Sequence, residues 1–229
     1  MATQPEIDKA LRRVLSPILR EAGFQSVTAR KAWAWPGECV WNLTVRGVGA
    51  YFSGCTGWPS ASLTAWTAVY YPFIPPRFAA PKEDRRGRLV PDEVAGHFRG
   101  HLERTLDQSR HTALLQAPPE RSRRDIWWVS DVPEDLLAVV ADIATAFIQQ
   151  GRPWFERLAD LPEAFRELEA EHDGLDKFYR AMHFAKHLRL ETKALHYAEA
   201  LKLEARRIGY TDDGRPQPER HGSRRRRSA

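Results

Sequence analysis

The stretch from Asp131 to Phe155 limits the possible fold more than any other part of the chain. Its apolar side chains recur at helical spacing around most of a predicted helix, at Leu136, Leu137, Val139, Val140, Ile143, Ala144, Phe147 and Ile148. The polar residues form only a narrow stripe, at Asp135, Asp142 and Gln149. A helix that is apolar around most of its circumference has to be covered by the rest of the protein. The sequence therefore predicts a central core helix.

The end of this helix carries a stop signal. Gly151 is followed by Pro153, and glycine in the left-handed conformation ends many helices, whereas proline cannot continue them. We expect the chain to reverse there. The aromatic pair 154–155 should then pack back onto the sheet near Trp127 or Trp128.

Extended segments dominate the sequence before the central helix. An N-terminal amphipathic helix ends at Gly23, after which Trp33 and Trp35 alternate with smaller residues. The Pro36–Gly37 turn and the alternating segment 40–48 complete a predicted hairpin.

Three further strands are predicted. Residues 61–73 are apolar on both faces, as in a central strand, and residues 126–129 form a short strand that leads into the central helix. Residues 90–106 fit either a helix or a strand. We favour the strand, because Gly96 and Gly100 would weaken a helix.

Helical periodicity continues after the central helix, over residues 161–171, 175–190 and 191–208. The fold class is therefore α+β: an antiparallel sheet of about four or five strands packs with the N-terminal and central helices, and a C-terminal helical region follows. We expect an α+β domain over residues 1–156, a helical appendage over 157–210 and a disordered Arg-rich tail over 211–229.

The net charge of +5 comes from residues 215–229, within this tail. Of the 35 Lys and Arg and 30 Asp and Glu, six Arg and one Glu lie at or after Arg215, which leaves 29 of each in residues 1–214. The body of the protein is therefore neutral. Nucleic-acid association is an alternative function through the tail only, by phosphate contacts of Arg224, Arg225, Arg226 and Arg227.

The sequence predicts a cytoplasmic protein without a membrane partner. Two cysteines, Cys39 and Cys55, form neither a disulfide framework nor a metal-binding CxxC motif. The chain begins with a charged amphipathic helix rather than a secretory signal. Glycines and prolines interrupt the charge-free segment between Arg46 and Arg77, so we interpret it as strands and not as a membrane helix.

Four short motifs resemble an uncharacterised bacterial family, domain of unknown function 4304. They are the sequence Leu-Ser-Pro-Ile-Leu-Arg-Glu-Ala-Gly-Phe that ends at Phe24, the strand Trp41–Val45, the Trp127–Trp128 strand and the Gly-Arg-Pro-Trp-Phe sequence that ends at Phe155. The resemblance covers roughly residues 6–155. It implies a cytoplasmic bacterial α+β protein and assigns no activity, cofactor or catalytic residue.

His97 and His101 are candidate metal ligands, because imidazoles four residues apart can share an ion if a carboxylate such as Glu103 joins them. No glutamate lies between them in an HExxH arrangement. The competing interpretation is an exposed polar face beside Arg99, and we expect no cofactor. A metal-dependent hydrolase that uses this pair is the second alternative function.

The strongest functional indication is a concentration of tryptophans in the predicted sheet. Exposed tryptophan and arginine are enriched at protein interfaces. We therefore predict a non-enzymatic protein-binding module that uses this sheet face or the C-terminal helices. The candidate binding residues are Trp33, Trp35, Arg99, Arg121, Arg123 and Arg124.

Overall fold

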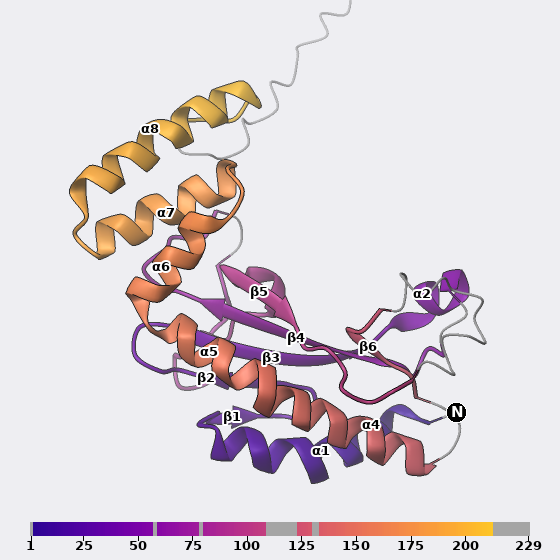
Figure 1. Cartoon of the computed structure of the whole chain (residues 1–229). Helices are drawn as coiled ribbons and strands as arrows, with labels where there is room; N and C mark the ends of the chain where they lie inside the picture. The colour runs from indigo at the N-terminus through magenta and orange to yellow at the C-terminus, as the bar shows by residue number, and fades with distance from the viewer. Residues whose placement is uncertain (1, 57–58, 78–79, 109–122, 130–132, 213–229) are drawn as a thin grey trace, which may run out of the picture. The chain divides into compact units, whose positions relative to one another are not determined.

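An antiparallel sheet forms the centre of the first part of the chain (Figure 1). Five strands pair in sequence order: β1 (Ser26–Val27), β2 (Lys31–Ala34), β3 (Val40–Gly47), β4 (Leu63–Tyr70) and β5 (Phe98–His101). A sixth strand, β6 (Ile126–Trp127), pairs with the beginning of β4. With helices packed against this sheet, the predicted α+β class is confirmed, and the two-residue strands β1 and β6 bring the strand number to six.

The computed structural model describes residues 2–56, 59–77, 80–108, 123–129 and 133–212. Its chain divides into two units, the first formed by Met1–Pro72 and Ala80–Glu163 and the second by Phe73–Ala79 and Ala164–Ala229. The four tail arginines, Arg121 and Asp131, the first residue of the predicted core-helix stretch, lie outside the described residues. The first unit contains the sheet and is described first.

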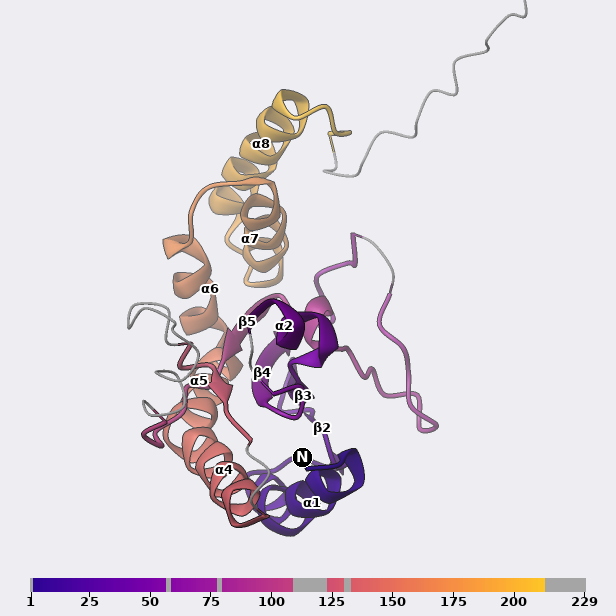
Figure 2. The same ribbon diagram turned by 90° about the vertical axis from the view of Figure 1, so that its right-hand side faces the viewer.

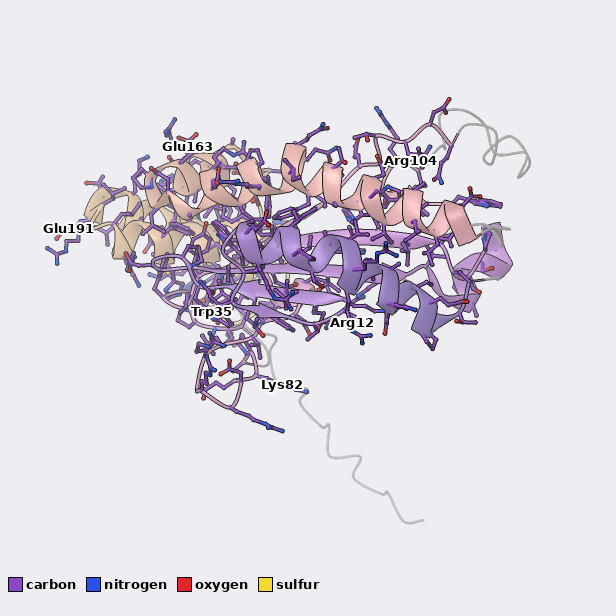
Figure 3. The ribbon with its side chains drawn as sticks, turned by 90° about the horizontal axis from the view of Figure 1, so that it is seen from below. Arg12, Trp35, Lys82, Arg104, Glu163 and Glu191 are labelled. Carbon is purple, nitrogen blue, oxygen red and sulfur yellow. The ribbon has the colours of Figure 1, made fainter. Side chains whose placement is uncertain are left out.

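Helices cover one face of this sheet. They are α1 (Gln4–Glu21), α4 (Pro133–Ala146), the π-helical turn η3 (Phe147–Gly151) and α5 (Arg152–Ala159). Figures 2 and 3 show α1 and α4 side by side against the sheet. The side chains of Ile7, Leu11, Val140 and Ile143 are fully buried there, which confirms that the Asp131–Phe155 stretch contains a core helix.

The hairpin, the central strand and the strand within residues 90–106 are confirmed. Gly37 takes the left-handed conformation, with φ 56°, in the turn between β2 and β3, and few other residues adopt this conformation without strain. Strand β4 pairs with both β3 and β5. Two short helical segments were not predicted: α2 (Gly49–Thr56), which lies in a glycine-rich passage, and the 3-10 turn η1 (Glu93–Ala95).

The predicted stop at Gly151 is wrong. Its φ is −67°, and the helix continues through η3 into α5. Pro153, near the start of α5, directly follows the π-helical turn, where the Arg152 N–H bonds to the oxygen of Phe147, five residues earlier, so the regular α-helical bonding pattern is already interrupted there. The glycine serves close packing instead: a Cβ at Gly151 would lie 3.1 Å from Cδ2 of Leu102 and 3.0 Å from Cδ2 of Phe147.

Because the chain does not reverse, the aromatic pair after Gly151 lies elsewhere than predicted. Phe155 stacks on Trp41 with 5.2 Å between ring centroids, and it is fully buried. Trp154 lies beside Gly100 of β5, not beside Trp127 or Trp128. Both rings therefore contact the sheet, but at other strands.

The second unit is helical, as the periodicity predicts. It consists of part of α6 (Leu161–Ala170) together with α7 (Leu175–His187) and α8 (Glu191–Arg207). The buried ammonium of Lys177 donates to the backbone oxygens of Glu169 and Glu171 at 2.9 and 2.6 Å, which satisfies carbonyls at the end of α6.

The short segment 73–79, which follows β4, also belongs to the second unit. Phe73 stacks on His187 with 3.9 Å between ring centroids, and Tyr179 donates to the backbone oxygen of Pro75 at 2.9 Å. No helix among the described residues combines the length and the apolar character needed to cross a membrane.

Candidate functional site

The two faces of the sheet differ in chemistry. Residues that lie directly opposite each other on paired strands share a face, and one row across the sheet contains Lys31, Thr44, Trp66 and His101. The face on which Trp41 contacts Phe155 is covered by helices. The face of the Trp66 row, called here the polar face, is the only one that collects charged side chains of β2, β3 and β5 among the described strands.

Part of the polar face is covered by the segment Leu89–Gly96. Trp33 Nε1 donates to the backbone oxygen of Pro91 at 2.8 Å, and Trp35 Nε1 donates to that of Leu89 at 2.9 Å. Figure 3 labels Trp35 and also Lys82, which precedes this segment in the chain. The structure therefore engages both predicted binding tryptophans in contacts within the chain.

A charged pair lies under the same segment. Glu93 of η1 is 1% exposed and forms an ion pair with Arg46 of β3. Beside it, the hydroxyl of Thr44 donates to Oδ1 of Asn42 at 3.0 Å, and both residues are buried. Since a buried charge needs a partner, this cluster anchors the segment to the sheet rather than offering a free group to a ligand.

The rest of the polar face carries a cluster around Trp66. The His101 ring lies over the Trp66 ring with 3.9 Å between centroids, and its Nδ1 is 3.9 Å from Oδ2 of Asp125. Arg123 donates to both oxygens of Asp125 at 2.7 and 2.6 Å. Burial alone would raise the pKa of Asp125, but the hydrogen bonds and charge of Arg123 outweigh it and hold the pKa below its ordinary value.

Two polar atoms in this part of the sheet lack partners. Within the described residues, Nε1 of Trp66 and Oγ1 of Thr64 are buried and form no hydrogen bond. An unsatisfied buried group costs about 1–3 kcal/mol, and native proteins keep few of them. Trp41 Nε1, on the helix-covered face, also lacks a partner, so the Trp66 cluster differs only in that its unsatisfied groups lie on the polar face, beside His101.

The predicted binding arginines differ in whether they form ion pairs within the described chain. Arg99 of β5 is exposed, and it forms no ion pair with any residue that the structure describes. Arg124 lies 3.8 Å from Oε2 of Glu103, and both side chains are more than half exposed. Arg123 is held by Asp125, as described above. The structure therefore brings Arg123 and Arg124 together with β5, and Arg99 has no ion-pair partner among the described residues.

The two candidate metal ligands lie at opposite ends of β5, with His97 directly before the strand and His101 at its last residue. The Nδ1 atom of His97 accepts the backbone N–H of Tyr71 at 2.9 Å, and its ring stacks on Tyr70. His101 lies on Trp66 instead. Four residues span about 13 Å along a strand, so the two imidazoles do not converge. No group of three potential ligands is found in the described part of the chain.

The thiols differ as well. Cys39 is buried, and desolvation raises its pKa to about 12, so the thiolate needed of a nucleophile is disfavoured. Cys55 is exposed at the end of α2.

Beyond β5, side chains from the core helix close the outer edge of the sheet. Oε1 of Gln150 accepts the N–H of Glu103 at 2.8 Å, while its Nε2 donates to the Glu103 oxygen at 2.9 Å. Asp142 accepts the N–H of Thr105 at 2.9 Å and Nε1 of Trp127 at 2.7 Å. Arg104, labelled in Figure 3, donates to the backbone oxygens of residues 123 and 126 at 3.1 Å.

Sequence reasoning missed Trp66, Asp125, Gln150 and Asp142 as parts of this region. Asp142 was recognised only as one member of the polar stripe on the core helix. Its spacing of eight residues from Gln150 places the two near one side of a helix, which is the only signal in the sequence that they act on one strand.

No family model, no curated protein and no solved structure matches this chain.

Proposed function

We propose that this chain is a protein-binding module whose contact surface is the uncovered part of the polar face, formed by Trp66, Arg99, His101 and Arg124. The single observation that carries the proposal is the cluster at Trp66, where unsatisfied buried groups adjoin exposed cations. Tryptophan, tyrosine and arginine dominate the binding energy of protein interfaces. As part of the same proposal, the protein is cytoplasmic and belongs to the bacterial family that its motifs resemble.

The proposal differs from the sequence-based version in its residues. Trp33 and Trp35 hold the segment Leu89–Gly96 on the sheet, so they support the surface rather than contact the partner. The binding aromatic is Trp66, and His101 lies over it.

A photo-crosslinking amino acid at position 99 tests this proposal in cells that produce the full chain. The matched control carries it at Arg12, an exposed arginine of α1 that lies on the helix-covered side and is labelled in Figure 3. We expect a discrete protein adduct from position 99 and none from position 12. A nuclease-sensitive adduct, or the same adducts from both positions, would contradict the proposal.

A further inference from the structure

The outer edge of β5 has backbone groups that no residue of the described chain satisfies. Leu102 N–H bonds to the oxygen of Ala65 on β4 at 3.0 Å, so Phe98, Gly100 and Leu102 direct their N–H and C=O groups toward β4. The groups of Arg99 and His101 then point away from the sheet. They form no hydrogen bond with any described residue.

Further along the same edge, side chains of the core helix form hydrogen bonds with the outward backbone groups. The outward groups of Glu103 are both bonded by the Gln150 amide, and the outward N–H of Thr105 is bonded by Asp142. A side-chain amide that donates and accepts in this way replaces a neighbouring strand. The core helix therefore pairs the edge as far as Glu103 and leaves the two donors and two acceptors of Arg99 and His101 open.

The side chains beside this edge indicate which kind of ligand it would bind. Arg99 is exposed and has no ion pair among the described residues, and the Arg124 side chain is 67% exposed. On the other face, Gly100 presents no side chain, and the half-buried Trp154 ring would lie 3.7 Å from a Cβ at that position. An apolar side chain that projects over Gly100 would therefore meet an indole.

We propose that β5 binds an extended, acidic segment of another protein by strand addition, with its backbone paired to Arg99 and His101. This inference rests on the proposed function and specifies its partner. Strand addition draws affinity from main-chain hydrogen bonds and specificity from alternate side chains. Here carboxylates face Arg99 and Arg124 on the polar face, and apolar side chains face Trp154 on the other. Charge complementarity favours such a segment over a second copy of this chain, whose β5 carries the same cations.

Substitutions at position 99 separate the backbone contribution from the charge. Arg99→Ala removes the charge and keeps the N–H, whereas Arg99→Pro removes both. Proline is tolerated in an edge strand where the N–H points outward. The probe is a synthetic peptide in which glutamate and valine alternate, with lysine-for-glutamate and backbone N-methylated versions as controls.

We expect the acidic peptide to bind the full chain and to slow hydrogen exchange of the Arg99 and His101 amides by at least about tenfold. Arg99→Ala should weaken binding about threefold, as for an exposed ion pair. Arg99→Pro should weaken it at least about tenfold more. The lysine and N-methylated peptides should not bind the unmodified chain.

Two outcomes would overturn strand addition. One is equal binding by Arg99→Pro and Arg99→Ala, or by the N-methylated peptide. The other is a dimer in light scattering that Arg99→Pro dissolves, which would make the occupant a second copy. If either occurs while the adduct at position 99 persists, the protein-binding function stands and only the mode fails. If position 99 gives no protein adduct, the proposed protein-binding function is contradicted as well.

Discussion

In the segment from Phe98 to Gln108, the backbone groups that point away from the sheet are hydrogen-bonded in one half and not in the other. In its second half, Gln150 and Asp142 bond the groups of Glu103 and Thr105. In its first half, the groups of Arg99 and His101 have no partner among the described residues. The two halves belong to one continuous stretch of chain, so the difference arises from the helix beside them and not from strand propensity.

The two halves of the segment therefore have different roles, one in stability and the other in recognition. The hydrogen bonds of Asp142 to the closed half stabilise the fold, because breaking them leaves the Thr105 N–H and the buried Trp127 Nε1–H without an acceptor. The two hydrogen bonds of Gln150 to Glu103 are exposed, so they should contribute less. An open edge contributes little to stability and is a site for pairing with another chain. Substitutions in the closed half should therefore change the free energy of unfolding, whereas those in the open half should change binding.

The largest expected effect is at Asp142. Asp142→Ala leaves the Thr105 N–H and the fully buried Trp127 Nε1–H without an acceptor, which should cost about 3 kcal/mol of unfolding free energy. Urea denaturation measures this change. Asp142→Asn, which keeps one carbonyl oxygen, should show an intermediate loss. A change below about 0.5 kcal/mol for Asp142→Ala would show that the edge is not held by this carboxylate.

Gln150 should have a smaller effect. Gln150→Ala removes both hydrogen bonds to Glu103, at 2.8 and 2.9 Å, and should lower the unfolding free energy by about 1.5 kcal/mol. The adjacent Gln149 is exposed, so Gln149→Ala is a matched control with a change within about 0.5 kcal/mol. Hydrogen exchange should also accelerate at Glu103 only in the Gln150 variant. Equal effects of the two variants would contradict the comparison.

Asp125 provides a test by pH at the border between the halves. Its pKa is lowered in the folded protein, chiefly by Arg123 against the opposing effect of burial. The folded state therefore favours the carboxylate, and its contribution is complete above the unfolded pKa of about 3.9. This contribution is lost as the pH falls through the lower folded pKa.

Asp125→Asn should thus be less stable than the unmodified chain by about 0.5 kcal/mol at neutral pH, since the Arg123 side chain is half exposed. The difference should vanish in acid, as measured by denaturation from pH 6 down to about 2. A difference that persists at the lowest pH would mean that the effect is not electrostatic.

The smallest expected change is at Arg99. Arg99→Ala removes an exposed side chain that forms no ion pair in the described chain. The free energy of unfolding should therefore change by no more than about 0.5 kcal/mol, and the melting temperature should shift only by the small amount that this change implies. Differential scanning calorimetry measures it, with Asp142→Ala as the contrasting variant. A large loss of stability at Arg99 would show that the first half is structural too.

Much of the fold follows from local patterns. The helical spacing of the Asp131–Phe155 stretch predicts a core helix, although Leu137 and Ile148, which are 43% and 50% exposed, show that only part of its circumference is covered. The alternation along residues 40–48 and the Pro36–Gly37 turn predict the hairpin. These features depend on residues near each other in sequence, so they can be recognised without knowing their neighbours in space.

The error at Gly151 has the opposite origin. Glycine serves both in left-handed turns and where atoms approach closely, and the sequence cannot distinguish the two uses. Here Leu102, which is distant in sequence, fills the space that a side chain would occupy. That contact is known only when β5 and the core helix are placed together.

The proposed binding surface likewise depends on contacts between residues that are distant in sequence. The sequence by itself determined the α+β class, the core helix, the hairpin and the neutral charge of the body, since propensity and periodicity are local. Tertiary structure alone decided that Trp33 and Trp35 anchor a loop. It also decided that Gln150 and Asp142 bond one half of an edge, while the outward backbone groups of Arg99 and His101 have no partner in the described part of the chain. Hydrogen-bond satisfaction at a sheet edge depends on which side chains another element brings there, and no local pattern specifies that pairing.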